Sequence, residues 1–291
     1  MTALQILIDG FAISALYALA AVGFTLMFGV SGVLNLSHGA IMVVAALIGW
    51  WAAGTLGLGV YLGTVVGVLA GLVCAYLTYF VVVRPIQRSR KIPREETEIF
   101  LLTGTLLWGI ILTLSFAAIF SDNPVTMRPL IGGVANIAGV RVPWNEIMIA
   151  VLCWVVIGLL WLLINRTAVG KSMLAASINP RGLTLLGFDL SRIYLLVWTI
   201  YGVLAGGAGV LLASFLGVGT ANAGQLTASA FSIVVLGGLG NVSGSLIAAF
   251  VVGYLETITA YLVAPTLRPI PALILLVLVV YFRPQGLLGR R

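Results

Sequence analysis

Long apolar runs separated by short polar stretches set the pattern of this 291-residue chain. Several runs reach the roughly 20 residues that a helix needs to cross a bilayer about 30 Å thick, and none alternates with the two-residue period of a strand. The pattern therefore predicts an all-α, polytopic transmembrane bundle. The apolar segments lie near 4–29, 38–56, 60–83, 99–120, 145–164, 193–216, 226–240, 243–263 and 270–283.

Glycine and polar residues interrupt two of these segments. The second segment follows SGVLNLSHG (31–39), and the seventh is short and interrupted at GGLGN (237–241). Paired interruptions of this kind are typical of broken or re-entrant helices beside a solute path, although close helix packing explains many of the glycines equally well. We therefore expect eight to ten spans within a single transmembrane domain covering residues 1–291.

The composition supports a membrane location. Hydrophobic residues make up 61% of the chain and charged residues 8%, whereas soluble domains carry about 25% charged residues. The mean hydropathy is +1.18. Cys74 and Cys153 both lie inside apolar runs, where packed thiols are expected rather than a disulfide.

Basic residues predict the orientation, because short loops rich in Lys and Arg stay on the cytoplasmic side. The loop 84–98 holds five, the loop 165–192 holds four and the tail from Arg283 holds three, which is twelve of the chain's fifteen. Both loops and the C-terminus are therefore predicted to be cytoplasmic. The loop 121–144 and, with three spans before Arg84, the N-terminus are predicted to be periplasmic. This pattern accounts for the net charge of +7, so no nucleic-acid partner is expected.

Few polar side chains lie inside the apolar runs, and each is a candidate site because burying it in hydrocarbon is costly. Glu256 is the one carboxylate well inside a span; either it pairs with a backbone or hydroxyl group, or it serves the solute or a proton relay. No Ser-His-Asp arrangement, paired carboxylates or metal ligand set is recognisable, so no catalytic residue and no metal site is predicted. The candidate residues of a translocation path are Asn35, Ser37, His38, Gly237, Gly238, Gly240, Asn241 and Glu256.

The stretch NRTAVGKS (165–172) ends like a phosphate-binding loop. Asn165 stands where that loop needs its first glycine, and an apolar span precedes it instead of a strand, so nucleotide binding is not expected here. The following residues predict a compact helical elbow, with a short helix from Ser172 to Ile178 stopped at Asn179-Pro180. This elbow is either a docking surface for a partner or an ordinary connection.

Four stretches in order along the chain resemble one known family. They are GFTLMFGVSGVLNLSHG (23–39), the loop with Gly170, Ala175, Asn179-Pro180 and Gly187, VLGGLGNVSGSLIAAFVVG (235–253) and RPQGLLG (283–289). They are similar to the inner-membrane permease subunits of ABC importers for branched-chain amino acids, of the leucine/isoleucine/valine type. Many members carry Arg-Ala after the methionine of the loop, where this chain has Leu174-Ala175.

The resemblance implies a permease subunit in a bacterial inner membrane, without catalysis or a cofactor of its own. Its expected partners are a similar but usually non-identical permease subunit, two cytoplasmic ATPase subunits that hold ATP and Mg²⁺, a periplasmic substrate-binding protein and membrane lipid. The elbow would contact the ATPases, and glycine or alanine at 170, 175 and 187 would allow its close packing. The residues implied for this coupling loop are Gly170, Lys171, Ser172, Met173, Ala175, Asn179, Pro180 and Gly187.

Two alternatives remain at this stage. The same architecture serves urea, short amides and other small organic solutes. An ion-coupled secondary transporter is a less favoured reading, because its spans normally carry an ion site or a proton relay.

Overall fold

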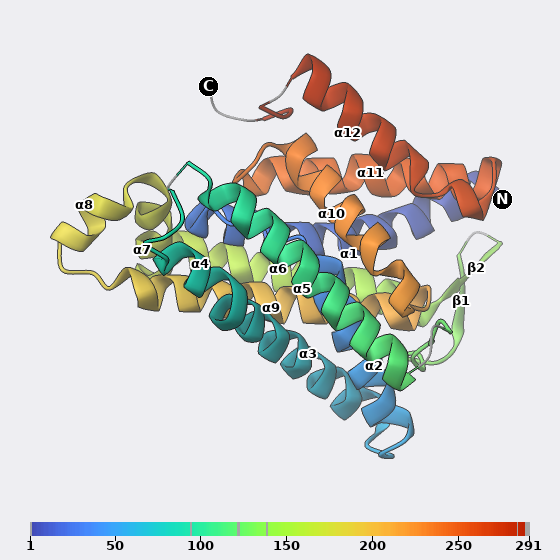
Figure 1. Ribbon diagram of the computed structural model, residues 1–291. Coiled ribbons are helices and arrows are strands. Elements are labelled where there is room, and N and C mark those ends of the chain that lie inside the picture. Colours follow the sequence, from blue (N-terminus) through green and yellow to red (C-terminus); the bar gives the residue numbers. More distant parts are fainter. Residues whose placement is uncertain (1, 94, 121–122, 138, 284, 289–291) are drawn as a thin grey trace.

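A computed structural model describes residues 2–93, 95–120, 123–137, 139–283 and 285–288 as a bundle of helices with one small hairpin (Figure 1). The longer helices are α1 (Thr2–Ser31), α3 (Gly59–Leu77), α5 (Thr97–Phe120), α6 (Trp144–Arg166), α9 (Leu190–Phe215) and α11 (Val242–Leu262). The shorter α-helices are α2 (His38–Gly54), α4 (Arg84–Arg88), α7 (Ala168–Ile178), α8 (Pro180–Leu185), α10 (Ala223–Gly237) and α12 (Ile270–Phe282). The remaining elements are η1 (Thr78–Val83), η2 (Thr220–Asn222), η3 (Pro265–Leu267) and the antiparallel strands β1 (Val134–Ile137) and β2 (Val140–Pro143).

The prediction of an all-α polytopic bundle is confirmed. In the described residues, seven helical stretches are long and apolar enough to cross a membrane, the seventh being η3 with α12. Each of the nine predicted segments contains one helix, but α2 has 17 residues and α10 has 15. At 1.5 Å per residue both are shorter than a bilayer core about 30 Å thick.

Both short helices begin inside the bundle. α1 ends at Ser31, where Gly32 adopts a φ of +66°, the left-handed conformation that commonly stops a helix. The chain then turns back, and α2 starts at His38, whose ring stacks on Phe24 of α1. α10 starts opposite the first turn of α2, where the Gly39 amide donates a hydrogen bond to Thr227 Oγ1.

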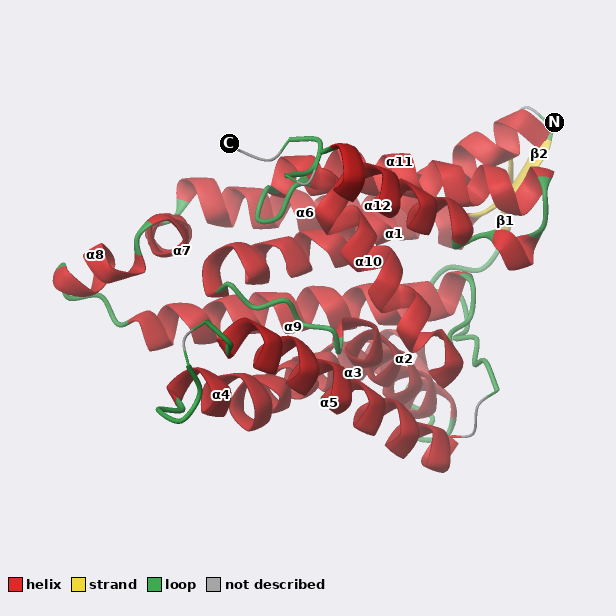
Figure 2. Ribbon diagram, turned by 45° about the horizontal axis from the view of Figure 1, so that its top comes forward, coloured by secondary structure: helices red, strands yellow, loops and turns green. Residues whose placement is uncertain are grey.

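The helices lie side by side and leave two distinct ends (Figures 1 and 2). We call the end that carries α4, α7, α8 and residues 285–288 the elbow end, and the end that carries β1, β2 and the start of α1 the hairpin end. The segments 84–93 and 165–192, together with residues 283 and 285–288, hold most of the described basic residues, and all of them lie at the elbow end. Arg94, Arg290 and Arg291 lie outside the described residues.

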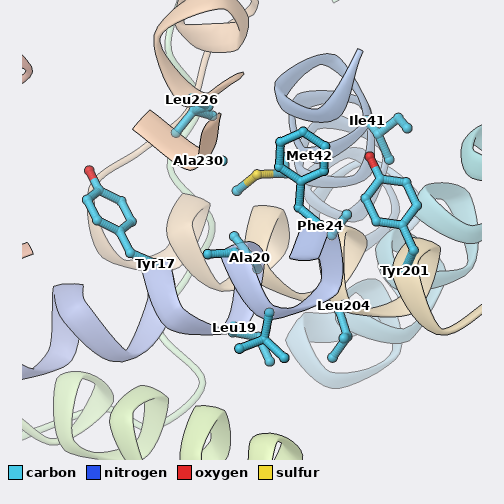
Figure 3. Close-up of a cluster of buried hydrophobic side chains, with 14 of the residues drawn as sticks. Tyr17, Leu19, Ala20, Phe24, Ile41, Met42, Tyr201, Leu204, Leu226 and Ala230 are labelled. Carbon is cyan, nitrogen blue, oxygen red and sulfur yellow. The ribbon is translucent and has the colours of Figure 1, made fainter. Parts of the chain in front are cut away.

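The core of the bundle surrounds α1, which packs against α11, α9, α6 and α10. Figure 3 shows side chains of α1, α2, α9 and α10 meeting in this core, among them Phe24, Met42 and Tyr201. By contrast, Ala272 is the one buried residue of α12 among those described. The apolar side chains of α12 therefore face outward, as expected where lipid or another membrane subunit covers a helix.

Candidate functional site

The polar residues before α2 form one buried hydrogen-bonded group. Ser37 Oγ donates to Asn35 Oδ1 at 2.7 Å, and Asn35 Nδ2 donates to the Tyr201 hydroxyl at 3.0 Å. The same hydroxyl lies 3.0 Å from His38 Nδ1. Asn35, Ser37 and His38 are fully buried, and none of them lines a described pocket.

This group fixes the break between α1 and α2. The Asn35 side chain also accepts the Ser37 amide at 3.0 Å, and the Leu36 amide donates to Thr105 Oγ1 of α5 at 3.1 Å. Buried backbone groups without a helical partner are thereby satisfied, which is what an interrupted helix in a membrane requires.

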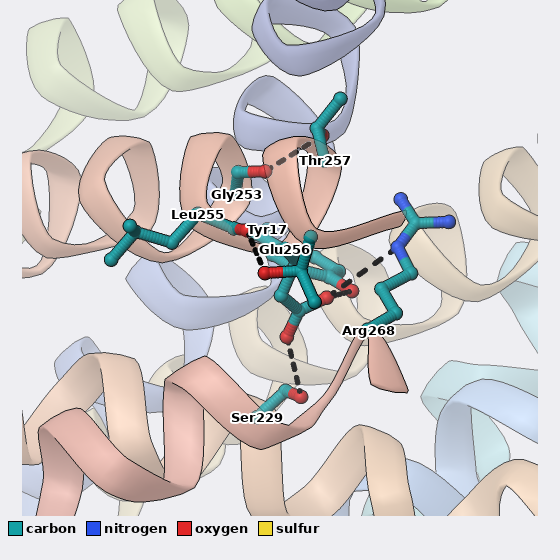
Figure 4. Close-up of polar contacts among 8 residues, drawn as sticks. Tyr17, Ser229, Gly253, Leu255, Glu256, Thr257 and Arg268 are labelled. Atoms are coloured by element: carbon teal, nitrogen blue, oxygen red, sulfur yellow. Dashed lines mark hydrogen bonds and ion pairs between the residues drawn. The ribbon is translucent and has the colours of Figure 1, made fainter. Parts of the chain in front are cut away.

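Glu256, in the second half of α11, lies in a second polar group (Figure 4). The Tyr17 hydroxyl of α1 donates to Oε2 at 2.6 Å, and Ser229 Oγ of α10 donates to Oε1 at 3.2 Å. Arg268 Nε lies 3.7 Å from Oε2. One carboxylate thus connects α1, α10, α11 and the residues before α12, and hydroxyl groups are among its partners, as one of the two sequence interpretations expects.

The GGLGN stretch connects α10 to α11 at the elbow end. Gly238 and Gly240 have φ values of +100° and +81°, and Asn241 Oδ1 caps α11 by accepting the Gly244 amide at 3.0 Å. Gly237 packs directly on Gly244, leaving no room for a side chain at either position. The Asn241 side chain also donates a hydrogen bond from Nδ2 to the Leu288 carbonyl at 2.7 Å, which attaches residue 288 to this link.

The structure therefore does not bring the eight predicted path residues together. They fall into three separate places: the buried start of α2, the link between α10 and α11, and the Glu256 group. In the described residues, no three His, Cys, Asp or Glu side chains meet as a metal site would require.

A hollow that sequence reasoning missed lies between α2, α5 and α10. It has a volume of about 280 Å³, and its wall includes Gly109, Thr113, Gly224 and Thr227. Small and hydroxyl-bearing side chains at the starts of two broken helices meet there. Single Gly and Thr residues in apolar helices carry no distinctive sequence signal, because the same types occur at ordinary helix contacts.

The elbow after α6 consists of α7 and α8. Thr167 caps α7, its hydroxyl accepting the Gly170 amide at 3.0 Å, and Asn179 caps α8, accepting the Gly182 amide at 2.9 Å. Gly170 is buried against the carbonyl groups of Leu163 and Ile164 at the end of α6. The predicted helix Ser172–Ile178 is thus found, extended at its start to Ala168.

The other predicted coupling residues differ in their surroundings. Met173 is buried, Ala175 is half-buried and Lys171 is exposed. The expected close packing at Gly187 is not found, because a side chain there would meet nothing within 4 Å. A φ of +87° is instead the reason for glycine at this position.

The elbow exposes several large apolar side chains at the elbow end. Ile178 is 81% exposed and Leu185 is 89% exposed, and Leu186 and Phe188 lie next to them in the chain. Exposed apolar groups gathered on a loop between spans mark a contact surface.

The phosphate-loop likeness of NRTAVGKS does not extend to its structure. Asn165 and Arg166 are the last residues of α6, and a helix follows from Ala168. The Gly170 and Lys171 amides both donate to Thr167, to its hydroxyl and its carbonyl. A phosphate-binding loop would instead direct such amides at the ligand.

Comparison with known proteins places this architecture in a family. The family described as "Branched-chain amino acid transport system / permease component" matches residues 6–281. The high-affinity branched-chain amino acid transport system permease protein BraD of Pseudomonas aeruginosa is 28% identical over 296 residues, which covers 99% of this chain and 96% of BraD.

Two further relatives also match this chain along most of their length. The corresponding permease protein LivH of Escherichia coli is 25% identical over 295 residues, covering 99% of this chain and 96% of LivH. A probable branched-chain amino acid transport permease protein LivH of Methanocaldococcus jannaschii is 25% identical over 292 residues, covering 95% of this chain and 89% of that protein. The chain is a multi-pass membrane protein and belongs to the family of branched-chain amino acid transport system permease components.

Proposed function

We propose that this chain is the membrane-spanning subunit of an ATP-driven importer for branched-chain amino acids. The observation that carries the proposal is the similarity to BraD and LivH along nearly the whole of each chain, the elbow included. The whole of residues 1–291 acts as one permease domain in a bacterial inner membrane.

The proposed orientation has the elbow end in the cytoplasm and the hairpin end in the periplasm. The convergence of the basic segments 84–93 and 165–192 with residues 283 and 285–288 at one end supports it, since Lys and Arg are retained on the cytoplasmic side. A substrate-binding protein would then deliver the solute at the hairpin end.

In this proposal two cytoplasmic ATPase subunits dock on the coupling loops of the two permease subunits, and the elbow is the coupling loop of this chain. The exposed Ile178, Leu185 and Leu186 support it, because apolar side chains beyond the membrane need a protein partner to leave water. ATP and Mg²⁺ are held by those subunits, and this chain binds no cofactor. A second permease subunit covers outward-facing apolar helices of the bundle.

The elbow transmits the motion driven by ATP hydrolysis because it is attached to two long helices, α6 and α9. Gly170 seats α7 on the end of α6, and α8 leads into α9 through Asp189, whose side chain caps α9 by accepting the Ser191 amide at 2.9 Å. A displacement of α7 and α8 therefore moves two long helices together. The ATPases would bias an equilibrium between two packed arrangements of the bundle through different contacts in each.

The test is reconstitution. The chain is co-purified with the subunits encoded beside it, and uptake of leucine, isoleucine, valine and urea into proteoliposomes is measured with the binding protein and ATP. Uptake of the three amino acids but not urea is expected. Uptake of urea alone would assign the chain to the other solute class, and ion-driven uptake without ATP would overturn the proposal.

A further inference from the structure

A polar pocket lies between the end of α9, the middle of α1, the start of α10 and the segment 265–269. Its volume is about 320 Å³, at the lower end of the range for small-ligand sites. One part of its wall is polar, with Gln225 and Arg268, and another part is aliphatic, with Leu212, Leu216 and Leu226. We call this cavity the Arg268 pocket.

Arg268 has hydrogen-bonding capacity that its surroundings do not use. Its side chain is 16% exposed, and its Nε and Nη2 have no hydrogen-bond partner. Glu256 Oε2 lies 3.7 Å from Nε. At this distance the carboxylate balances the charge of Arg268 but accepts no hydrogen bond from it. Burying guanidinium donors without partners is costly, so their retention here needs a reason.

Glu256 does not supply the missing acceptors, because Arg268 Nε stays 3.7 Å from its Oε2. Tyr17 donates to Oε2 and Ser229 to Oε1, and both bonds fix the carboxylate within the bundle (Figure 4). Glu256 therefore compensates the charge of Arg268 and leaves its planar fork of donors for another anion. The fork matches a carboxylate, which it binds through two parallel hydrogen bonds.

We propose that the Arg268 pocket binds the carboxylate group of a small aliphatic solute through Arg268, with the aliphatic wall holding its side chain. The inference rests on the proposed function, since it names where an amino acid first contacts this chain. An acidic patch on a docking protein is a poorer match, because it would need an exposed guanidinium. The first turn of α10 borders both this pocket, through Gln225, and the hollow lined by Gly224 and Thr227.

The experiment measures binding of two probes to the assembled complex in nanodiscs, without the binding protein, by saturation-transfer NMR titration. L-Leucine and L-leucinamide share the side chain and the ammonium group but differ in the carboxylate. The expected Kd for leucine is about tenfold lower than for leucinamide, as for a charge-assisted pair of hydrogen bonds. Equal affinities, or no leucine binding, would overturn the inference.

Variants at Arg268 and Glu256 test whether Arg268 causes the preference for leucine over leucinamide. Arg268→Gln alone leaves a buried carboxylate uncompensated and is prone to misfold, so it is paired with Glu256→Gln to keep the group neutral. The double variant is expected to bind both probes with the weak affinity of leucinamide, whereas Glu256→Gln alone keeps the preference for leucine. Arg268→Lys, which keeps the charge and loses the fork, is expected to lose most of that preference. A preference that persists in the double variant would refute the role of Arg268.

The outcomes distinguish a failure of the proposed function from a failure of the Arg268 pocket. If proteoliposomes take up no amino acid but the nanodisc complex prefers leucine through Arg268, the proposed function fails and the pocket stands. If uptake is normal and remains normal in the double variant, the proposed function stands and the carboxylate site is refuted.

Discussion

The Tyr17 hydroxyl is one of two hydroxyl groups that donate to the buried carboxylate of Glu256, at 2.6 Å. Tyr17→Phe removes this donor and leaves an oxygen of the fully buried Glu256 carboxylate without that partner. A loss of about 1–3 kcal/mol of stability is expected. It is measured as a lowered Tm of the protein in detergent.

Tyr254→Phe is the matched control. Its hydroxyl donates to the Leu7 carbonyl at 3.1 Å at an exposed site, so solvent or lipid headgroups replace the lost bond. A much smaller Tm change is expected. Equal changes in the two variants would show that burial of the Glu256 group contributes little.

Gly39 lies where α2 and α10 approach most closely. A methyl group there would overlap the Ala223 carbonyl oxygen and lie 2.7 Å from the Thr227 amide nitrogen. Gly39→Ala is therefore expected to cost about 1–3 kcal/mol, as overpacking does. Gly207→Ala, in open space on α9, is expected to leave the Tm unchanged or slightly raised. A tolerated Gly39→Ala would contradict the close contact of the two helix starts.

At the scale of elements, the apolar runs predicted the position of an α-helix in each of the nine segments, seven of which belong to stretches long enough to cross a membrane in the described residues, because hydrocarbon imposes both length and composition. It could not show that α2 and α10 start inside the bundle. That arrangement depends on Tyr201 meeting Asn35 and His38, a contact between residues more than 160 positions apart along the chain. Local patterns carry no information on such pairs.

The candidate site was less predictable than the fold. The elbow was recognisable, since Asn179-Pro180 ends one helix and begins the next by local chemistry. The path residues were chosen for polarity, but Asn35 and Ser37 use their polar atoms within the fold. Arg268 was not selected, because nothing local in a short loop shows that its guanidinium is buried.

The seating of α7 on α6 gives a prediction at this scale. Gly170→Leu would drive α7 away from the Leu163 and Ile164 carbonyl groups, so we expect ATPase co-purification or solute-stimulated ATP hydrolysis to be impaired. Gly158→Leu makes the same replacement in open space on α6 and is expected to retain both. Normal coupling in the Gly170 variant would contradict the role of the elbow.

For the whole molecule, the proposed orientation is testable with single cysteines. Asn136 of the hairpin and Ser177 of the elbow are both exposed, and the native Cys74 and Cys153 are buried. A membrane-impermeant maleimide applied to intact spheroplasts is expected to label Asn136→Cys but not Ser177→Cys. Ser177→Cys is expected to be labelled only after the membrane is permeabilised. The reverse pattern would invert the bundle.

The bond from Asn241 to the Leu288 carbonyl, together with the 2.7 Å bond from the Leu287 amide to the Leu236 carbonyl, has a consequence for biosynthesis. Residues 287 and 288 follow α12 in the chain, yet they fasten the link between α10 and α11, two helices that are synthesised earlier. The link therefore stays incompletely fastened until residue 288 has been synthesised, so a chain truncated before residue 287 would insert without these two hydrogen bonds.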